Sequence, residues 1–319
     1  MNRLHSLFTK PHHFLHTTYP PASKLAATAM STGAASGRRE KLVVILGPTG
    51  CGKTKLSIDL ASRFFPSSEI INSDKIQVYR SLDITTNKVP LGDRKNVRHH
   101  LLGGVESSES HPEFTPSDFR SSASRIISEM TSRRQLPFLA GGSNSFVYSL
   151  LAEKYNPDSD VFAESNPVPC SALRYDCCFI WVDVSPPVLD QYLAKRVDDM
   201  LDSGMFAELS EYFKNLGPGR RVSKYGVNKA IGVPEFERYF RGEISYEAAV
   251  AEIKENTWHL AKRQVEKIRR LREGLGWEME RVDTTAVLRA ALDGAPAPEV
   301  WEKQVVEPSA RIVRKFLME

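Results

Sequence analysis

The chain has 319 residues, of which 41% are hydrophobic and 26% are charged, and its formal net charge at pH 7 is +4. This composition is ordinary for a globular protein, and the length allows one large domain or two small ones. No apolar run reaches the roughly 18 to 20 residues that a membrane-spanning helix needs, so the sequence excludes such a helix and we expect no membrane association.

The first 39 residues differ from the rest of the chain. They contain no acidic residue, five Lys or Arg residues and nine Ser or Thr residues. A basic, hydroxyl-rich and acid-poor segment is typical of an organelle transit peptide, and we interpret residues 1–39 as one for the plastid, ahead of the mitochondrion or the cytosol. A plain disordered N-terminus is the alternative. Without this segment the chain has 38 basic and 39 acidic residues, so its net charge no longer suggests a nucleic-acid partner.

The first predicted elements are a strand, a glycine-rich loop and a helix. The run KLVVIL at 41–46 is apolar apart from its first residue and indicates a buried strand. GPTGCGKT at 47–54 follows, and then a helix in which Leu56, Leu60 and Phe64 recur at helical spacing.

The loop GPTGCGKT matches the phosphate-binding P-loop pattern, and it lies between a strand and a helix as that motif requires. Gly47, Gly50 and Gly52 let several backbone N–H groups point into one concavity, next to the positive end of the following helix. Lys53 adds a full positive charge, and the hydroxyl of Thr54 is a ligand for Mg²⁺, the expected cofactor. The motif predicts a bound diphosphate or triphosphate without identifying the molecule that carries it.

Short buried strands and helices then alternate along the chain. Further strands are predicted at residues 68–74, 136–142 and 177–184. Helices follow the last two, and another begins after Thr115, with Pro116 in its first turn and Asp118 closing a capping box. This alternation predicts an α/β fold of the P-loop NTPase-like kind, with a parallel sheet flanked by helices on both faces.

Two breaks divide the rest of the chain. Residues 156–174 are rich in Pro, Ser and Asp and predict a mobile surface loop, and residues 215–226 precede a helical segment with a long amphipathic helix. A last strand is expected within 276–285. The predicted organisation is a transit peptide at 1–39, a P-loop α/β core at 40–215, a smaller helical substrate-binding segment at 216–275, and a return to the core with a C-terminal tail at 276–319.

Asp74 ends the second predicted strand, at the edge where open parallel sheets bind ligands. Small-molecule kinases also place an acid there, and an Asp that caps the following turn is the structural alternative. The four cysteines, Cys51, Cys170, Cys177 and Cys178, lack the spacing of metal ligands, so we expect no zinc site and a reducing compartment.

Seven further segments occur in a fixed order after the P-loop: INSDKIQVYRSLDITTNKVP, HHLLG, FTPSDFR, PFLAGGSNSF, KRVDDMLDSGMFAEL, KAIGVPEF and LAKRQVEKI. Together they resemble the isopentenyltransferase family, which moves a dimethylallyl group to the N6 amine of adenine in free nucleotides or in tRNA. The similarity extends from about residue 41 to residue 283. Within the family it is greatest to the plant adenylate members, which start cytokinin synthesis.

The resemblance implies that the P-loop holds the diphosphate of dimethylallyl diphosphate with Mg²⁺, while the adenine nucleotide enters from the other side. Asp74 would act as the general base that takes the N6 proton. Lys53, Thr49 and Arg196 would stabilise the leaving diphosphate. From the residues alone, Arg196 is more typical of a solvated helical side chain than of a catalytic one.

The resemblance also implies an acceptor site. It assigns Asp74, Thr86, Asn87 and Lys88 to the adenine and prenyl channel, and it makes Lys229, Lys262 and Arg263 candidates for binding the acceptor's phosphates. A polar turn at 86–88 is the simpler interpretation of that segment. A solvated helix face is an equal alternative for Lys262 and Arg263, because six of the eleven residues from 262 to 272 are basic. We interpret His99 and His100 as structural.

The sequence therefore predicts a monomeric adenylate dimethylallyltransferase that uses ADP, ATP or AMP and binds no tRNA. A tRNA dimethylallyltransferase is the nearest alternative, but the tail has no Cys or His for the zinc finger that eukaryotic members of that type generally carry. A small-molecule kinase would explain the P-loop and Asp74 but not DITTNK or LAKRQ. A non-enzymatic nucleotide-binding switch is the third alternative.

Overall fold

The computed structural model describes residues 39–106, 112–163, 170–216 and 223–319. Arg39–Glu319 form one compact unit. The predicted transit peptide lies outside the described residues except for Arg39, as do parts of the segments at 156–174 and 215–226. In the part of the chain that the structure describes, no helix is both long and apolar enough to cross a membrane.

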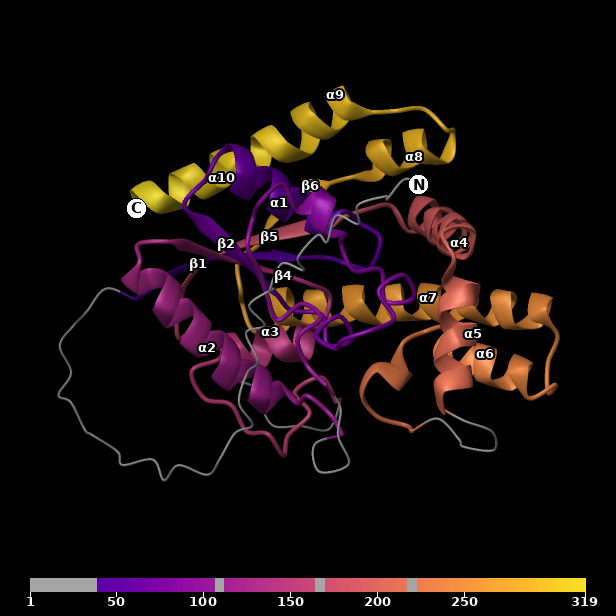
Figure 1. The fold of residues 1–319 in the computed structure, drawn as a ribbon. Coiled ribbons are helices and arrows are strands. Elements are labelled where there is room, and N and C mark those ends of the chain that lie inside the picture. The colour runs from indigo at the N-terminus through magenta and orange to yellow at the C-terminus, as the bar shows by residue number, and fades with distance from the viewer. Residues whose placement is uncertain (1–38, 107–111, 164–169, 217–222) are drawn as a thin grey trace, which may run out of the picture. The chain divides into compact units, whose positions relative to one another are not determined.

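The described residues contain six parallel strands in one sheet, in the order β3-β2-β4-β1-β5-β6 (Figure 1). The strands are β1 (Lys41–Leu46), β2 (Ser68–Asn72), β3 (His99–His100), β4 (Leu136–Ala140), β5 (Asp176–Asp183) and β6 (Glu280–Asp283). The predicted parallel sheet is confirmed, and so is the late strand, which pairs with β5. The sequence does not predict β3, because two histidines are too few to show a hydrophobic period.

The central strand β1 is buried on both faces of the sheet. Leu42, Val44 and Leu46 pack on one side and Val43 and Ile45 on the other, and each is at most 1% exposed. Successive side chains of a strand point to opposite faces, so a run that is almost wholly apolar suits a sheet with helices on both sides.

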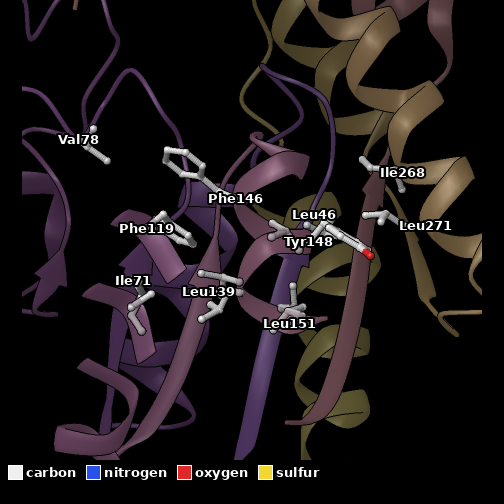
Figure 2. Packing of buried hydrophobic residues seen from close by; sticks show 14 of the residues in the cluster. Leu46, Ile71, Val78, Phe119, Leu139, Phe146, Tyr148, Leu151, Ile268 and Leu271 are labelled. Carbon is white, nitrogen blue, oxygen red and sulfur yellow. The ribbon is translucent and has the colours of Figure 1, made fainter. Parts of the chain in front are cut away.

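Helices α2 (Pro116–Ser132) and α3 (Asn144–Leu151) cover the first face. Figure 2 shows Phe119 of α2 beside Phe146 of α3, and their rings stack with centroids 4.5 Å apart. The predicted start of α2 is confirmed, since the Thr115 hydroxyl accepts a hydrogen bond from the Asp118 N–H and the Asp118 carboxylate accepts one from the Thr115 N–H.

Helices α1 (Lys53–Arg63) and α4 (Pro186–Asp202) pack against the second face. Both begin directly after a strand of the sheet, so their N-termini lie at its carboxyl edge. This arrangement brings the P-loop and the first turns of α4 to the same edge.

A helical region follows α4. It comprises α5 (Met205–Leu216), the short 3₁₀ turn η2 (Gly226–Lys229), α6 (Val233–Phe240) and α7 (Tyr246–Arg269), which continues as a wide π turn, η3 (Arg270–Gly274). Rings from α5, α6 and α7 form an aromatic cluster of Phe206, Phe236, Tyr239, Phe240 and Tyr246. Helix α7 extends from this cluster to the sheet, where it contacts α3 and α4.

The segment predicted as a return and tail is mostly helical. After β6 come α8 (Thr285–Leu292), α9 (Pro298–Trp301), the π turn η4 (Glu302–Val306) and α10 (Glu307–Met318). Helix α8 lies beside α4, whereas η4 contacts α1, and Trp301, Val305 and Val306 are buried in the same core cluster as residues of α1 (Figure 1).

Candidate active site

The carboxyl ends of three adjacent strands meet at a cavity of about 190 Å³. The P-loop follows β1, Asp74 follows β2, and Gly141 and Gly142 follow β4. Of the residues predicted for the donor, the cavity is lined by Thr49, Gly50, Gly52, Lys53, Thr54 and Arg196. Of those predicted for the acceptor it is lined by Asp74 and Asn87, whereas Thr86, Lys88, Lys229, Lys262 and Arg263 are not among the lining residues. The predicted cradle and the predicted base therefore face one space.

Two glycines let the P-loop lie close to its neighbours. A Cβ atom on Gly47 would stand 2.4 Å from the carbonyl oxygen of Val182 in β5. Gly50 has a φ of 82°, and its Cβ would stand 2.6 Å from Leu193 Cδ2 in α4. A side chain at either position would force the loop away from β5 or α4.

Lys53 is buried at the start of α1, and its ammonium group donates to the Pro48 carbonyl oxygen at 2.6 Å. It also lies 3.8 Å from the sulfur of Cys51, which is fully buried inside the loop. Burial raises the pKa of the Cys51 thiol, although the charge of Lys53 opposes the shift, so the thiol is neutral near pH 7. A bound diphosphate would offer Lys53 charged acceptors, which form stronger hydrogen bonds than a carbonyl does.

Arg196 of α4 lines the same cavity as Lys53. Its Nη1 donates to the Thr49 hydroxyl at 3.0 Å, and the side chain lines the cavity instead of extending into solvent. Desolvation lowers the pKa of Arg196, while Tyr192 and the negative charge of Asp74 raise it. Because a guanidinium group titrates far above neutral pH, Arg196 remains charged and is the second cation of the cradle.

Asp74 is half-buried at the end of β2. Its Oδ1 accepts the Ile76 N–H at 3.0 Å, so the carboxylate does cap the following turn, as the structural alternative predicts. The Asp74 N–H donates to Asn72 Oδ1 at 3.3 Å, and this contact fixes the backbone that carries the carboxylate. Since Asp74 also lines the cavity, turn capping and a role toward a ligand are compatible in one residue.

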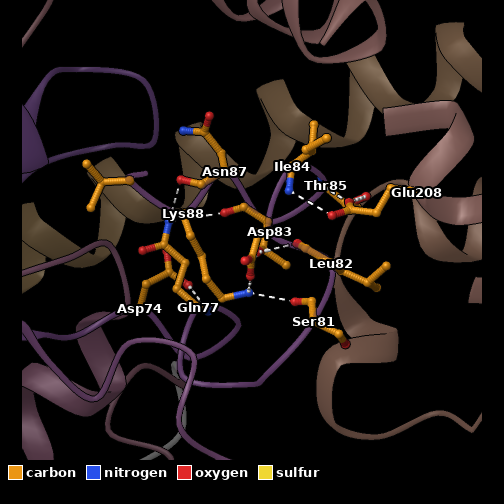
Figure 3. A network of polar contacts seen from close by, with 12 residues as sticks. Asp74, Gln77, Ser81, Leu82, Asp83, Ile84, Thr85, Asn87, Lys88 and Glu208 are labelled. Carbon is orange, nitrogen blue, oxygen red and sulfur yellow. Dashed lines mark hydrogen bonds and ion pairs between the residues drawn. The ribbon is translucent and has the colours of Figure 1, made fainter. Parts of the chain in front are cut away.

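Gln77 joins Asp74 to the segment DITTNK. Its Nε2 donates to the carbonyl oxygens of Thr86 and Asn87, each at 3.1 Å, and both Gln77 and Asn87 line the cavity. The other two predicted residues form hydrogen bonds within their own loop. Thr86 donates its hydroxyl to the Leu82 carbonyl oxygen at 2.7 Å, and Lys88 pairs with Asp83 at 2.8 Å (Figure 3). In this arrangement Thr86 and Lys88 shape the loop around Asn87.

Glu208 of α5 anchors the same loop from outside. Its carboxylate accepts the backbone N–H groups of Ile84 at 3.0 Å and Thr85 at 2.8 Å, and also the Thr85 hydroxyl at 2.7 Å (Figure 3). The sequence analysis did not select Glu208, although it lies within the family segment KRVDDMLDSGMFAEL. A glutamate on a helix gives no sign by itself that a distant loop needs an anchor.

Gln264 of α7 is another residue of the site that was not predicted from the sequence. It is buried and lines the cavity, and its Oε1 accepts the Thr49 N–H of the P-loop at 2.7 Å. The only signal was its position in LAKRQ, directly after Lys262 and Arg263. Those two residues are exposed, and Lys262 lies over the ring of Trp258 at 5.5 Å.

Lys229 pairs with Glu113 near the mouth of the site. Partial desolvation lowers the pKa of the neighbouring Lys75, and the charges of Lys229 and Lys267 lower it further, whereas Glu113 and Asp74 raise it. These lysines therefore lie close enough to one another and to Asp74 for their charges to interact.

His99 and His100 do not line the cavity. His100 is buried and forms a hydrogen bond of 2.6 Å with Glu69, and burial lowers the pKa of both histidines. This placement agrees with a structural role. Within the described ranges, no group of three or more His, Cys, Asp or Glu side chains could hold a metal ion by itself.

Comparison with known proteins places the chain among prenyl-transferring enzymes. The family model described as IPP transferase matches residues 77–166 and 154–271. The chain is 48% identical to adenylate isopentenyltransferase 1, chloroplastic, of Arabidopsis thaliana, over 92% of this chain and 86% of the relative. It is 51% identical to adenylate isopentenyltransferase of Humulus lupulus, over 86% and 90%. A further Arabidopsis relative, adenylate isopentenyltransferase 7, mitochondrial, is 42% identical over 87% and 80%.

Solved structures share the fold. A eukaryotic dimethylallyltransferase acting on tRNA superposes with a TM-score of 0.71 at 23% identity, over 88% of this chain and 80% of that one. The tRNA isopentenylpyrophosphate transferase of Bacillus halodurans gives 0.65 at 26% identity, over 80% and 95%. The predicted fold is thereby confirmed.

Proposed function

The chain belongs to the IPP transferase family, and we propose that it transfers the dimethylallyl group of dimethylallyl diphosphate to the N6 amine of adenine in ADP, ATP or AMP, the first step of cytokinin biosynthesis. The observation that carries this proposal is that one cavity contains both a diphosphate cradle and a carboxylate that can take a proton. The plant relatives, matched over most of both chains, are named adenylate isopentenyltransferases. A small-molecule kinase would share the cradle and Asp74 but not these relatives.

The donor diphosphate is proposed to bind in the P-loop. As the bond from the allylic carbon to oxygen breaks, negative charge grows on the leaving diphosphate, and fixed cations lower the energy of that state. Lys53 and Arg196 both line the cavity, and the Thr49 hydroxyl accepts a hydrogen bond from Arg196. These three residues can therefore contact the leaving group without rearrangement of α1 or α4.

Mg²⁺ is proposed as the cofactor. The site fits it, because the hydroxyl of Thr54 lines the cavity beside the P-loop and Mg²⁺ prefers oxygen ligands, with substrate phosphates and water completing its shell. Thr54 would hold the ion from the first turn of α1. When bound, the ion would neutralise part of the diphosphate charge.

Asp74 is proposed as the general base. The N6 lone pair of adenine is delocalised into the ring, so removal of a proton during attack makes N6 a better nucleophile. Because Oδ1 accepts the Ile76 N–H, Oδ2 is the oxygen proposed to take the N6 proton. Asn87 and Gln77, which line the cavity beside Asp74, are placed to contact the adenine edge.

The outer phosphates of ADP or ATP are proposed to bind basic residues at the mouth of the site. Lys229, Lys262 and Arg263 are the predicted candidates, and the interaction of Lys229 with the charge of Lys75 supports a cationic surface next to Asp74. Since Lys229 pairs with Glu113, a phosphate would replace that carboxylate as its partner. We further propose that the enzyme acts as a monomer, that tRNA is not its substrate, and that residues 1–39 direct it to the plastid, as the chloroplastic names of several relatives suggest.

The test is an assay of the full chain with Mg²⁺, dimethylallyl diphosphate and, in turn, AMP, ADP, ATP or unmodified tRNA, with prenylated product detected by mass. The proposal expects prenylated adenine nucleotide, and a loss on the order of 10² to 10⁴ in kcat for Asp74→Asn. Product on tRNA alone would assign the chain to the tRNA branch. Phosphoryl transfer without prenyl transfer would assign it to the kinases.

A further inference from the structure

The side-chain amide of Gln264 connects the two sides of the active site. Its Oε1 accepts the Thr49 N–H at 2.7 Å, and its Nε2 donates to the Gly142 carbonyl oxygen at 3.0 Å. Because a backbone N–H can only donate and a carbonyl can only accept, these two partners fix the orientation of the amide. The contacts join helix α7 to the P-loop and to the loop after β4.

The connection continues to the donor cradle. The Thr49 N–H donates a hydrogen bond to Gln264 Oε1, and the Thr49 hydroxyl accepts one from Arg196 Nη1 at 3.0 Å. A chain of three hydrogen bonds thus runs from Gly142 through Gln264 and Thr49 to Arg196. It crosses four segments of the protein that are distant in sequence.

The geometry around Gln264 leaves little freedom. The residue is only 7% exposed, and a Cβ atom on Gly142 would stand 2.4 Å from its Nε2. Its own carbonyl oxygen accepts Asn144 Nδ2 at 3.1 Å, which holds α7 against the start of α3. An apolar residue of similar size at this position would leave the Thr49 N–H and the Gly142 carbonyl without these partners, which is unfavourable for polar groups shielded from water.

We propose that Gln264 is a positioning residue that holds Thr49, and through it Arg196, in place for the donor diphosphate. The proposal rests on the proposed function for its catalytic consequence, but the positioning itself concerns any diphosphate in the P-loop. Helix α7 also carries Lys262 and Arg263, the candidates for the acceptor phosphates. Gln264 therefore ties the donor cradle to the helix that the acceptor would contact.

Three full-chain variants separate the parts of this proposal. Gln264→Leu removes both hydrogen bonds of the amide. Gln264→Glu keeps an acceptor for the Thr49 N–H, but as a carboxylate it cannot donate to Gly142. Asn144→Ala is the matched control, because it removes a contact to the backbone of Gln264 and leaves the amide in place.

The measurements are kcat and KM for prenyl transfer, the affinity for inorganic pyrophosphate with Mg²⁺ by calorimetry, and thermal unfolding. We expect Gln264→Leu to lower kcat/KM for the donor on the order of 10- to 100-fold and to weaken pyrophosphate binding, because small misplacements of catalytic groups have effects of this size. Asn144→Ala should lower the unfolding temperature while it keeps pyrophosphate affinity within about threefold, less than the tenfold change that corresponds to 1.4 kcal/mol.

Gln264→Glu gives a readout that a merely structural role would not produce. A protonated carboxyl group accepts from Thr49 and donates to Gly142, as the amide does. Burial and the negative charge of Asp74 raise the pKa of a carboxyl group at this position, whereas the charges of Lys53 and Arg196 and the hydrogen bond from Thr49 lower it. In the pH range where this carboxyl group takes up a proton, the activity of Gln264→Glu relative to wild type should rise as pH falls, whereas that of Gln264→Leu should not.

Failure of the two proposals can be told apart. If the wild-type chain transfers no prenyl group but Gln264→Leu weakens pyrophosphate binding, the proposed function fails and the positioning role stands. If the wild type is active and Gln264→Leu keeps its pyrophosphate affinity and kcat/KM, the positioning role is overturned.

Discussion

Trp301 donates a hydrogen bond from its indole Nε1 to Asp59 Oδ2 at 2.8 Å, although the two residues are 242 positions apart in the sequence. Its ring also packs against Gly52 of the P-loop, whose Cβ, if present, would lie 3.2 Å from two ring carbons. Lys55 lies over the other part of the ring, 4.3 Å from its centroid. Through Trp301, helix α9 therefore contacts both α1 and Gly52 of the P-loop and supports the phosphate cradle.

Substitution of Trp301 should affect both stability and donor binding. Trp301→Phe keeps a ring but removes a hydrogen bond to a charged, buried carboxylate, so we expect a loss of about 1.5 to 3 kcal/mol in the free energy of unfolding. Trp301→Ala should lose about 3 to 5 kcal/mol. Both should raise the KM for the donor, because Gly52 loses its packing. Urea unfolding and steady-state kinetics measure the two effects.

The control for Trp301 is Glu302→Gln, which removes an ion pair with Arg63 at a site where both side chains are partly exposed. Such pairs contribute about 1 kcal/mol or less. A Trp301→Ala variant no less stable than this control would show that the C-terminal helices do not support α1.

Asp59 should make stability depend on pH in the acid range. Burial by itself raises the pKa of this carboxyl group, but hydrogen bonds from Lys55, Lys95 and Trp301 outweigh it, and the net pKa is lowered. The ionised form therefore stabilises the folded state above the unfolded pKa of roughly 4, and this contribution is lost as pH falls through the lower folded value. Asp59→Asn should be less stable than wild type at pH 7, and the difference should shrink below pH 4.

Unfolding free energies measured from pH 7 to pH 3 test this prediction. Asp293→Asn, at an exposed position, is the control and should stay close to wild type at neutral pH. A gap between Asp59→Asn and wild type that is constant with pH would contradict the assignment of the ionised carboxylate.

Substitution of Glu208 should weaken binding of the acceptor nucleotide and leave binding of the donor diphosphate unchanged. Removing its carboxylate in Glu208→Ala leaves the N–H groups of Ile84 and Thr85 without their charged acceptor, each contact worth about 1.5 to 3 kcal/mol. The loop that carries Asn87 should loosen, so the KM for the adenine nucleotide should rise about tenfold or more while pyrophosphate affinity stays unchanged. Glu211→Ala, on an exposed position of the same helix, should behave like wild type. Equal losses for donor and acceptor would refute the specific role.

Arg196 and Thr49 should act as a unit. Arg196→Gln removes the second cation of the cradle and should lower kcat on the order of 10² to 10³-fold. Arg196→Lys keeps the charge but not the planar guanidinium, so it should recover only part of the loss. Thr49→Val removes the hydroxyl that Arg196 contacts, and the double variant should lose less than the sum of the two single losses. Lys195→Gln, the exposed neighbour paired with Asp199, serves as the control.

Much of this fold follows from local sequence, because each local signal agrees with its tertiary setting. KLVVIL indicates a strand buried on both faces, and β1 is one. Thr115 and Asp118 mark the N-terminus of α2 in sequence and form the capping box in the structure. The P-loop is recognisable because its glycines are needed by the backbone itself, whatever surrounds it.

The supporting contacts of the site could not be predicted in this way. Glu208, Gln264 and Trp301 act through partners more than one hundred positions away, and no local period or motif records such a pairing. Lys262 and Arg263, in the basic run at 262–272, were the predicted candidates for the acceptor phosphates. The residue of that run that lines the cavity is the uncharged Gln264. Lys88 was predicted from the resemblance of DITTNK to a family segment, yet its ammonium group pairs with Asp83 within its own loop.

The alkylation rate of the buried Cys51 thiol can report on the conformation of the P-loop. Alkylating reagents attack the thiolate, and a cysteine that is fully buried with a raised pKa presents neither the thiolate nor a path to it. Modification of Cys51 therefore requires the loop to open away from β5, so its rate records how often the cradle comes apart. Cys170 is partly exposed and would react first. Its modification rate, measured by peptide mapping of the same sample, serves as the internal reference. A ligand that closes the cradle would slow the modification of Cys51 and leave that of Cys170 unchanged.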